Sequence, residues 1–292
     1  MTKYTNIVGV WDLNAIQNGV GKFLIFQQEL LQLREVLDVE NVDLYVCNSR
    51  GGTSREIITI ISRLNPYLGN LNFVNRQEEV NVSATDYRWP GNTDYASCSY
   101  SESYQTVQKY WEKTHKIVQM KTPETVKQLA QIWMDRHVAD AKMITIHLKN
   151  NALDLQSNAN QQSWLDFFLY SEKETPDVKF VIIGLDKVDD VICSLHNVIS
   201  VQNHGGNLEL DLALVDMSTA FMGMASGPCN RAILSDKPYL IWKHPGHHQE
   251  AMERELVNPK GFGFANRNQK FMVEWDTFKN LQHEFAQLIN NT

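Results

Sequence analysis

The sequence predicts an α/β fold built from two doubly wound halves. Short apolar runs, each of a length typical of a buried strand, alternate along the chain with segments whose apolar residues recur at helical spacing. Two successive helical segments interrupt this alternation between residues 101 and 137, and a new run of strands begins after them. We therefore expect an N-terminal α/β domain of residues 1–138 and a C-terminal α/β domain of residues 139–292, with the boundary in the region of residues 115–140.

Length and composition are typical of a soluble globular protein. The 292 residues suffice for two ordinary domains, and 43% of them are hydrophobic and 21% charged. A net charge of −7 argues against a general nucleic-acid-binding protein, which is usually basic. No apolar run is long enough to span a bilayer, and the first residues lack the pattern of a signal peptide. The four cysteines are widely spaced without a C-x-x-C pair, so we expect reduced thiols in a cytoplasmic protein.

The chain begins with a predicted βαβ unit. Residues 5–13 form an apolar strand candidate, residues 23–37 carry apolar side chains at helical spacing, and residues 42–47 are a second strand candidate. Gly19 and Gly21 give backbone freedom to the loop between the first strand and the helix. This loop lacks the third glycine of a dinucleotide-binding fingerprint and the GKS or GKT end of a phosphate-binding loop. Two interpretations fit it, a flexible strand-to-helix turn and a ligand-binding loop.

The rest of the first half is less regular. We expect a helix at residues 54–64, a short strand at residues 71–74, and helices at residues 101–118 and 122–137. Residues 77–110 are polar and rich in aromatic side chains. Such a segment fits a binding loop whose rings stack on a sugar or a base, and it fits equally an ordinary surface excursion held by its own aromatic residues.

The second half again alternates strands and helices. Asn207 is the expected N-cap of one helix, and Pro228 occupies the first position of the next, where its missing N–H does no harm. The predicted strands lie at residues 143–148, 178–184, 198–201, 220–225 and 239–242. The predicted helices lie at residues 163–170, 189–195, 208–218, 228–235 and 276–290.

A small-residue turn, Ser226-Gly227, connects a predicted strand to the helix that follows it. At the carboxyl end of a strand and the amino end of a helix, backbone N–H groups and the helix dipole favour an anion such as a phosphate. A plain strand-to-helix connection fits this turn equally well. The apposed strand ends of two α/β domains would form a cleft, which is the usual place for a ligand in such folds.

Three segments together resemble the GT-B glycosyltransferases, which have two Rossmann-like domains and use nucleotide-sugar donors. Residues 19–27 (GVGKFLIFQ) look like the G-L-G-N-Q-x-F-Q loop of α-1,2-type fucosyltransferases. Residues 146–149 (IHLK) look like the H-x-R-R strand end of the same enzymes, and residues 225–232 (ASGPCNRA) look like the D-S/T-G-x-x-H-x-A segment of heptosyltransferases. The three segments occur in the right order and frame nearly the whole chain. The resemblance implies an α/β fold of two Rossmann-like domains facing across a cleft.

The resemblance also implies where the donor binds. The donor phosphates would lie between Lys149 and the Ser226-Gly227 turn of the second domain, which holds the donor in GT-B proteins. Gly21 and Lys22 would approach them from the first domain, which holds the acceptor. Such enzymes generally stabilise the departing diphosphate with basic side chains and helix N-termini, often without a bound metal.

Several positions of the motifs depart from the families. Lys22 stands where fucosyltransferases have Asn and heptosyltransferases have an Asp thought to act as base. Lys149 and Asn150 replace the two arginines of H-x-R-R, and Ala225 replaces the Asp of D-S/T-G. A lysine neutralises a phosphate as a point charge, without the bidentate fork of arginine. We therefore still expect phosphate binding, whereas the motifs do not identify the catalytic base.

Two residues at predicted strand ends are candidates for the base that deprotonates the acceptor. Asp12 ends the first strand, and His147 ends the strand that opens the second half. A carboxylate or an imidazole at the edge of a cleft performs this task when its pKa suits. The competing interpretations are a solvated loop cap for Asp12 and a core histidine bonded to the backbone for His147.

A cluster of three histidines, His244, His247 and His248, lies in a predicted loop. Its spacing is not that of H-E-x-x-H, so we favour a loop that contacts the ribose or the base over a metal site. A solvated helix face would also explain Glu253, one of the acidic residues that follow. The residues expected to contact the nucleotide or ribose are Gly184, Lys243, His244 and Glu253.

We expect no metal and no cofactor, since the nucleotide-sugar is a substrate and the adjacent Asp189 and Asp190 fit a helix start better than a metal-binding D-x-D motif. The expected function is transfer of a sugar from a nucleotide-sugar donor to a glycan or another hydroxyl acceptor. The alternatives are a sugar-nucleotide epimerase or hydrolase of the same fold and a non-catalytic nucleotide-sugar- or glycan-binding protein. We expect no nucleic-acid partner, and peripheral contact with a membrane only if the acceptor is lipid-linked.

Overall fold

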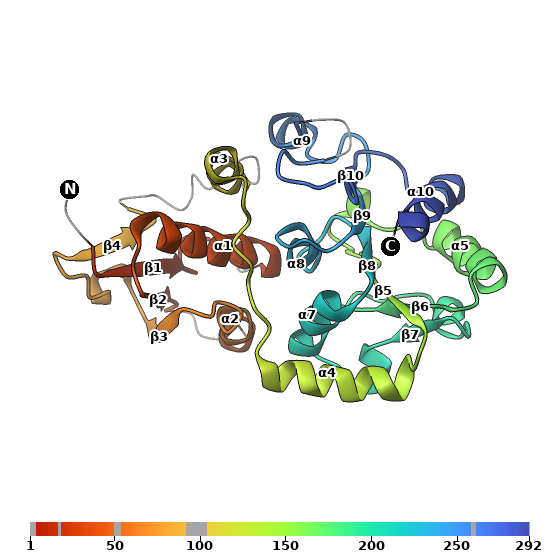
Figure 1. The fold of residues 1–292 in the computed structure, drawn as a ribbon, viewed down its shortest axis with the longest axis horizontal. Coiled ribbons are helices and arrows are strands. Elements are labelled where there is room, and N and C mark those ends of the chain that lie inside the picture. The colour runs from red at the N-terminus through yellow and green to blue at the C-terminus, as the bar shows by residue number, and fades with distance from the viewer. Residues whose placement is uncertain (1–3, 17–18, 50–53, 92–103, 258–260, 292) are drawn as a thin grey trace. The chain divides into compact units, whose positions relative to one another are not determined.

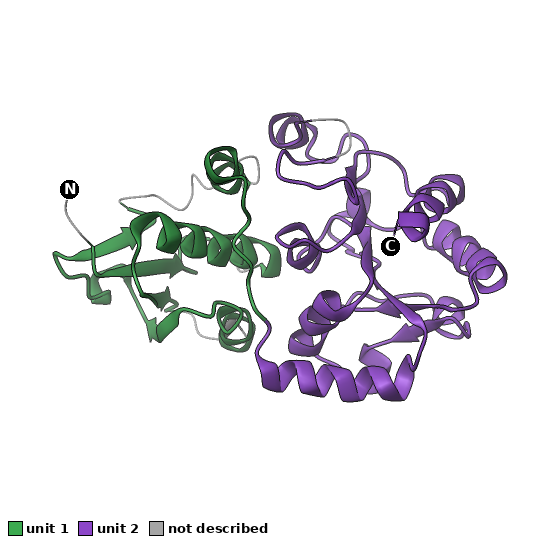
Figure 2. Ribbon diagram, viewed as in Figure 1, with its two compact units in different colours: residues 1–121 green, residues 122–292 purple. Residues whose placement is uncertain are grey.

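The computed structural model of the chain describes residues 4–16, 19–49, 54–91, 104–257 and 261–291. The chain divides into two compact units, unit 1 with residues 1–121 and unit 2 with residues 122–292 (Figure 2). Each unit holds its own β-sheet, and the strand pairs in both sheets are parallel. The α/β fold predicted from the sequence is confirmed.

Unit 1 is built on a four-stranded sheet in the order β3-β2-β1-β4 (Figure 1). Helix α1 packs closely on β1 because Gly9 has no side chain. A Cβ added to Gly9 would lie 2.8 Å from Cδ1 of Leu30. The elements of unit 1 are β1 (Asn6–Asp12), α1 (Val20–Leu37), β2 (Asn41–Cys47), α2 (Ser54–Ser62), β3 (Leu68–Val74), η1 (Gln77–Glu79), β4 (Asp86–Trp89) and α3 (Gln105–Thr114).

Helix α1 begins earlier than the sequence predicts. It starts at Val20 with Gly19 as its N-cap, and the N–H of Phe23 donates to the carbonyl of Gly19 at 3.0 Å. Gly21 and Lys22 therefore lie in the first helical turn and not in the expected loop. Glycine is well accepted at an N-cap, and a first turn needs no apolar residue, so the hydrophobic period identified only the buried part of the helix.

Strand β4 is not predicted from the sequence. Its four residues are half-buried and pair in parallel with β1. A strand this short at the edge of a sheet has too few residues for a clear alternation of apolar and polar side chains. Part of the aromatic segment in which it lies, residues 92–103 with Tyr95 and Tyr100, is outside the described residues.

Unit 2 is built on a six-stranded sheet in the order β10-β9-β8-β5-β6-β7 (Figure 1). Strand β9 was predicted from the sequence, but helix α9 and strand β10 were not. They have seven and four residues, which is too short for a helical or strand period to be seen in the sequence. The elements are α4 (Glu124–His137), β5 (Lys142–His147), η4 (Leu155–Ser157), α5 (Gln161–Glu174), β6 (Val178–Ile182), α6 (Asp190–Cys193), β7 (Val198–Ser200), η5 (Gln202–His204), α7 (Leu208–Met217), β8 (Ala220–Met224), α8 (Cys229–Ile233), β9 (Tyr239–Trp242), α9 (Gln249–Glu255), β10 (Gln269–Met272) and α10 (Phe278–Asn291).

The strand order of unit 2 determines where a ligand would bind. When its six strands are numbered along the chain, the sheet order is 6-5-4-1-2-3, which is that of dinucleotide-binding Rossmann folds. Strand β5 pairs with β6 on one side and with β8 on the other, so the winding reverses between β5 and β8. In such sheets ligands bind beyond the carboxyl ends of the strands at this reversal. The loops that follow β5 and β8 border this position.

Aromatic side chains of α5 and α10 form much of the core of unit 2. Trp164, Phe167 and Phe168 of α5 are fully buried. The ring centroid of Phe167 lies 5.4 Å from that of Phe180 in β6 and 5.1 Å from that of Phe285 in α10. Truncating such a ring to alanine costs roughly 3–5 kcal/mol of stability. This core holds the strands whose carboxyl ends carry the polar residues described below.

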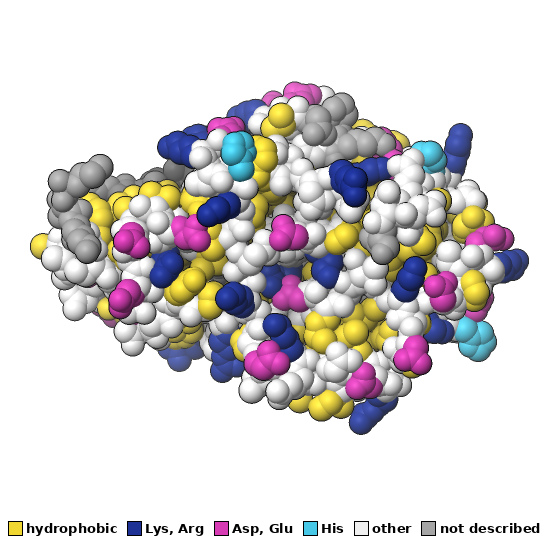
Figure 3. All heavy atoms as spheres, viewed as in Figure 1, with side chains coloured by type: hydrophobic (Ala, Val, Ile, Leu, Met, Phe, Trp, Pro, Cys, Tyr) yellow, Lys and Arg dark blue, Asp and Glu magenta, His cyan; other side chains and the backbone are white. Residues whose placement is uncertain are grey.

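No helix among the described residues has both the length and the apolar character needed to cross a bilayer. On the face drawn in Figure 3, acidic and basic side chains are interspersed. Such a mixture is typical of a solvated surface. The described cysteines, Cys47, Cys193 and Cys229, are free thiols, and Cys98 lies outside the described residues.

Candidate functional site

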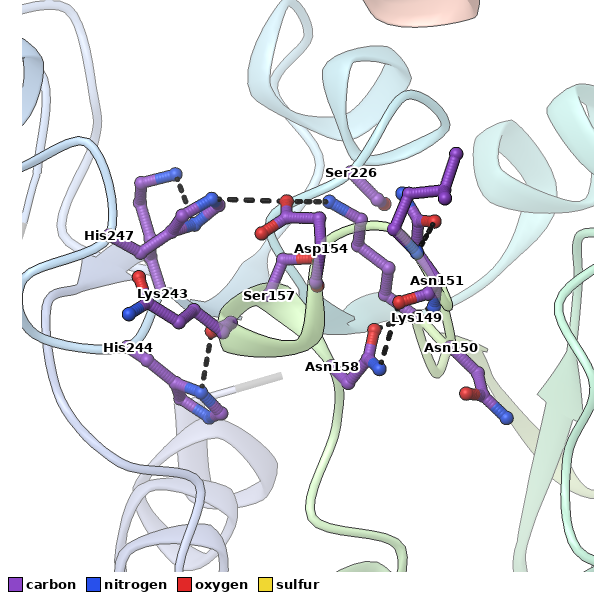
Figure 4. A network of polar contacts seen from close by, with 12 residues as sticks. Lys149, Asn150, Asn151, Asp154, Ser157, Asn158, Ser226, Lys243, His244 and His247 are labelled. Carbon is purple, nitrogen blue, oxygen red and sulfur yellow. Dashed lines mark hydrogen bonds and ion pairs between the residues drawn. The ribbon is translucent and has the colours of Figure 1, made fainter.

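Three polar side chains come from the carboxyl ends of neighbouring strands in unit 2. Lys149 follows β5, Ser226 follows β8, and Lys243 follows β9 directly. Since β5, β8 and β9 are adjacent and parallel, their carboxyl ends lie at one edge of the sheet. Figure 4 shows the three residues in a network of polar contacts. The structure therefore brings together two residues predicted to bind phosphate, Lys149 and Ser226, and one predicted to contact the nucleotide.

A continuous chain of polar contacts connects the two lysines. Nζ of Lys243 lies 3.1 Å from Nδ1 of His247, and Nε2 of His247 lies 3.1 Å from Oδ2 of Asp154. The same Oδ2 lies 3.5 Å from Nζ of Lys149. An ammonium group only donates, so Nδ1 of His247 accepts from Lys243 and Nε2 carries the hydrogen that is donated to Asp154. This geometry defines the tautomer of His247.

The environment changes the pKa of each member of this chain. Burial and the nearby Lys149 ammonium lower the pKa of Lys243 to about 8. Burial and the Lys243 ammonium lower the pKa of His247 to about 4. Burial opposes ionisation of Asp154, but the neighbouring His247 and Lys149 help to lower its pKa overall. At neutral pH the chain thus holds a cationic Lys243, a neutral His247 and an ionised Asp154.

The loop that carries Lys149 and Asp154 is closed by its own hydrogen bonds. The N–H of Ala159 donates to the carbonyl of Lys149 at 2.9 Å. Asn151 and Asn158 bond to each other twice, through Asn151 N–H to Oδ1 at 2.6 Å and through Asn158 Nδ2 to the Asn151 carbonyl at 3.2 Å. These contacts tie the two ends of the loop together and hold Lys149 over the end of β5.

A buried pair, His244 and Asp276, fixes the same loop from the other side. His244 is 6% exposed, its Nδ1 lies 2.9 Å from the carbonyl of Gln156, and its Nε2 lies 2.7 Å from Oδ1 of Asp276. The other carboxylate oxygen of Asp276 accepts from the backbone N–H of Asn160 at 2.8 Å and from the indole of Trp164 at 2.9 Å. Both ring nitrogens of His244, predicted to contact the nucleotide, are therefore used within the chain.

The Ser226-Gly227 turn differs from its prediction in one respect. The helix after it, α8, has only five residues, fewer than residues 228–235 predicted from the sequence. Its dipole is correspondingly small, because the macrodipole is the sum over aligned peptide units. Oγ of Ser226 is buried and has no hydrogen-bond partner among the described residues, a costly arrangement for a hydroxyl group. A ligand with acceptor atoms would satisfy this hydroxyl.

His147 and Gly184, predicted as a catalytic residue and a nucleotide contact, are neighbours at the same edge. His147 is 3% exposed, and its Nε2 lies 3.2 Å from Oδ2 of Asp186, so its partner is a carboxylate and not the backbone. A Cβ added to Gly184 would lie 2.6 Å from the His147 ring, so Gly184 makes room for it. The N–H of Gly184 donates to Asp211 at 3.0 Å, and burial raises the pKa of Asp211 to about 6.

Asp12, the other predicted catalytic residue, ends β1 in unit 1. Its Oδ1 accepts from the backbone N–H of Asn14 at 2.9 Å, and its Oδ2 accepts from Nε2 of Gln77 at 2.7 Å. Oε1 of Gln77 in turn accepts from Nη2 of Arg88 at 2.7 Å. Asp12 is only 7% exposed, so it is a buried turn-forming carboxylate and not a solvated cap.

The remaining predicted residues lie in separate places. Gly21 and Lys22 are in the first turn of α1 in unit 1. Glu253 is exposed on α9 of unit 2, where its Oε1 accepts from Nε2 of Gln249 at 2.8 Å. Among the described residues, no three side chains of His, Cys, Asp or Glu form a group that could hold a metal ion. Metal-independent activity remains a prediction.

Asp154 and Asp276 belong to this site although the sequence did not predict them there. Asp154 lies in the polar loop that follows Lys149. Its place in this loop, beside a predicted phosphate-binding lysine, is the one feature of the sequence that could have indicated its role. Asp276 precedes the last helix and contacts Trp164 and His244, which are far from it in the sequence. No local pattern reveals such contacts, because only the folded sheet brings these segments together.

No known family model and no curated protein matches the sequence. Solved structures do match, and 98% of the chain aligns with a glycosyl transferase family 9 protein from Veillonella parvula, covering 90% of that chain at a TM-score of 0.62 and 13% identity. The same share aligns with the ADP-heptose lps heptosyltransferase II of E. coli, covering 99% of it at a TM-score of 0.61 and 10% identity.

The chain has the GT-B fold. It is also similar to the UDP-GlcNAc 2-epimerase of Neisseria meningitidis, with 98% of this chain and 92% of that chain aligned at a TM-score of 0.51 and 12% identity. At these identities the similarity establishes the fold, and one fold hosts several reactions. The reaction has to be argued from the residues of the site.

Proposed function

We propose that this protein is a glycosyltransferase that moves a sugar from a nucleotide-sugar donor to a hydroxyl group of a glycan or another acceptor. The observation that carries the proposal is the convergence of Lys149, Lys243 and the buried hydroxyl of Ser226 at the carboxyl edge of the unit 2 sheet. Lys149 and Ser226 follow β5 and β8, the two strands between which the winding of this Rossmann-type sheet reverses, and Lys243 follows the neighbouring strand β9. Such sheets bind ligands at this reversal.

The chemistry of the site suits a departing diphosphate. In glycosyl transfer, negative charge grows on the diphosphate as its bond to the sugar breaks. Preorganised cations and hydrogen-bond donors stabilise this charge without reorganising at the moment of reaction. Two ammonium groups and a hydroxyl provide such donors, and the heptosyltransferase of similar fold is named for its ADP-heptose substrate. We propose that the donor diphosphate of this protein binds here.

For the catalytic base we propose Asp12. Each carboxylate oxygen can accept more than one hydrogen bond, so the contacts to Asn14 and Gln77 leave acceptor capacity for a hydroxyl of the acceptor. We propose for His147 a positioning role, because its Nε2 faces Asp186 and the ring is almost completely buried. Asp12→Asn is then expected to lower turnover strongly while the affinity for the donor nucleotide is unchanged.

We propose that Gly21 and Lys22 of unit 1 contribute contacts to the donor phosphates. We propose that Gly227 and Glu253 of unit 2 line the part of the site that binds the nucleotide. The proposal for Lys22 rests on its place in the first turn of α1, which follows the end of β1. The proposed acceptor is a glycan or another molecule with a hydroxyl group, and a lipid-linked acceptor would bring the protein to a membrane surface. Lys22→Ala tests this part and is expected to lower turnover more than donor affinity.

The experiment that tests the function has two steps. A thermal-shift screen with ADP, UDP, GDP, CMP and dTDP identifies the nucleotide, because a ligand that binds only the folded state raises the unfolding midpoint. The corresponding nucleotide-sugars are then incubated with a panel of glycan acceptors, and transfer is followed by mass spectrometry. Binding of a nucleotide followed by acceptor-dependent transfer supports the proposal. No shift with any nucleotide would refute it.

A second candidate function is a sugar-nucleotide epimerase or hydrolase. The structural similarity to a UDP-GlcNAc 2-epimerase favours it, because that enzyme also acts on a nucleotide-sugar. This candidate predicts turnover of the nucleotide-sugar without an acceptor. A non-catalytic binding protein, favoured by Ala225 and Asn150 at the motif positions, predicts nucleotide binding without any turnover. The same incubations with and without acceptor separate the three functions.

A further inference from the structure

The carboxylate of Asp154 lies at the centre of the polar network, between Lys149 and His247 (Figure 4). Its side chain is 33% exposed, whereas the side chain of His247 is 10% exposed and that of Lys149 is 21% exposed. Asp154 is thus the most accessible of the three groups. An anion arriving from solvent would meet this carboxylate at the position where Lys149 and Lys243 attract it.

The backbone of Asp154 is held independently of its carboxylate. Its N–H donates to the carbonyl of Asn151 at 3.2 Å. Its carbonyl accepts from the backbone N–H of Ser157 at 3.1 Å and from the Ser157 hydroxyl at 2.7 Å. The carboxylate can therefore rotate away from Lys149 about its own side-chain torsions while the loop keeps its hydrogen bonds. An internal group that can leave without unfolding its loop is suited to exchange with a ligand.

Asp154 is the carboxylate that directly contacts Lys149 and His247. Lys149 and Lys243 are near enough that the first lowers the pKa of the second. Glu255 also acts on Lys243, and Asp186 interacts with Lys149, but these interactions act through space, whereas Oδ2 of Asp154 lies 3.5 Å from Nζ of Lys149 and 3.1 Å from Nε2 of His247. Rotation of the Asp154 carboxylate therefore exposes the Lys149 ammonium to an arriving anion. The hydroxyl of Ser226, buried without a partner among the described residues, is a further group that a phosphate oxygen would satisfy.

We propose that Asp154 is an exchangeable internal counter-ion that occupies the position of one donor phosphate until a diphosphate binds. This inference rests on the proposed function. When the carboxylate rotates away, two ammonium groups face the two charges of the diphosphate in a nucleotide-sugar. A singly charged anion gains less from them, since it must displace the same carboxylate for half of the charge. Asp154 therefore makes the site selective for diphosphates.

The alternative role for Asp154 predicts the opposite result. If the carboxylate served to hold Lys149 in a binding geometry, its removal would weaken anion binding. If it competes with the ligand, its removal strengthens anion binding. The sign of the change in affinity therefore decides between the two roles. Asp154→Asn is the suitable variant because asparagine keeps the size of the side chain and one acceptor oxygen while removing the charge.

The test is calorimetric titration of inorganic pyrophosphate into the full chain at pH 6.5. This pH lies below the Lys243 pKa of about 8, which leaves a margin for the loss of Asp154, whose charge helps to keep Lys243 protonated. The control is Asp166→Asn, which makes the same change in net charge at an exposed position of α5. We expect Asp154→Asn to bind pyrophosphate roughly three- to tenfold more tightly than the parent, and Asp166→Asn to differ from the parent by less than about twofold.

Equal or weaker binding by a folded Asp154→Asn protein would overturn the proposal, as would the absence of binding by both parent and variant. Lys149→Ala, titrated in parallel, separates this failure from that of the proposed function. If the parent binds and Lys149→Ala binds much less, but Asp154→Asn gains nothing, only the counter-ion role is wrong. If Lys149→Ala binds as the parent does, the anion binds elsewhere, and both the counter-ion role and the proposed diphosphate site are wrong.

Discussion

Replacing Lys243 by methionine is predicted to stabilise the fold while it removes one cation from the proposed diphosphate site. Lys243 is 8% exposed, and burial is the main cause that lowers its pKa from 10.5 to about 8. The pKa of Lys243 is lower in the folded than in the unfolded chain, so the unfolded chain binds this proton more tightly. Burying the protonated lysine therefore lowers the free energy of unfolding. Methionine has a similar length, carries no charge and adapts to irregular packing.

The magnitude follows from the shift in pKa. A decrease of about 2.5 units corresponds to about 3 kcal/mol at pH 7, where the unfolded chain is fully protonated at this lysine. The unfolded state binds more protons than the folded state between about pH 8 and pH 10.5, so the stability of the parent rises with pH in this window. The stability that is lost by burying the Lys243 amine therefore decreases to about 1 kcal/mol at pH 10. The Lys243→Met variant also loses the hydrogen bond to Nδ1 of His247, and this loss reduces its gain in stability by about 1 kcal/mol at either pH.

The assay is urea denaturation of parent and Lys243→Met at pH 7 and at pH 10, with Lys173→Met on the exposed surface of α5 as the control. We expect the variant to be about 2 kcal/mol more stable than the parent at pH 7 and nearly equal to it at pH 10. The Lys173 variant should change stability by less than about 0.5 kcal/mol at both pH values. A Lys243→Met protein that is less stable than the parent at pH 7, or whose gain does not decline with pH, would refute this reasoning.

Three further predictions concern the same edge of the sheet. Gly184→Ala should lower the free energy of unfolding by about 2 kcal/mol or more in a thermal or urea titration, because the backbone has φ +90 and the new Cβ would meet the ring of His147 at 2.6 Å; equal stability would show that the ring moves freely. Asp276→Asn should weaken nucleotide binding about tenfold in calorimetry, because Asp276 holds the loop of Lys149 through Asn160 and through His244; unchanged affinity would mean that the loop is fixed without it. Sugar transfer should persist in EDTA, and a loss of turnover that Mn²⁺ or Mg²⁺ restores would show that a metal takes part.

The sequence predicted the fold because its strands and helices are long enough to show their periods. The apolar runs of β1, β2, β5 and β8 and the helical spacing of α1 and α10 agree with the structure within a few residues. The elements that it missed, β4, α9 and β10, have four to seven residues each. Elements this short are defined by pairing with a neighbour, and a local pattern does not contain that neighbour.

The site was predictable only in part, for a similar reason. Lys149, Ser226 and Lys243 each stand at a predicted strand end, and parallel strands bring such ends to one edge, so their convergence could be anticipated. The role of His244 could not be anticipated from the sequence, because its partner Asp276 comes from a segment 32 residues further along the chain. The position of each strand end was a local property, whereas the partner of each side chain depended on the order of strands in the sheet.

Calorimetric titration of the identified nucleotide-sugar into the parent, Lys149→Ala and Lys173→Ala tests most directly the claim that unit 2 binds a donor diphosphate at the carboxyl ends of β5, β8 and β9. Lys149→Ala removes one charge-assisted contact, worth about 1.5–3 kcal/mol, and should bind about ten- to a hundredfold more weakly than the parent. Lys173→Ala, which removes an exposed lysine of α5, should bind as the parent does. A folded Lys149→Ala protein that binds the nucleotide-sugar as tightly as the parent would contradict the account.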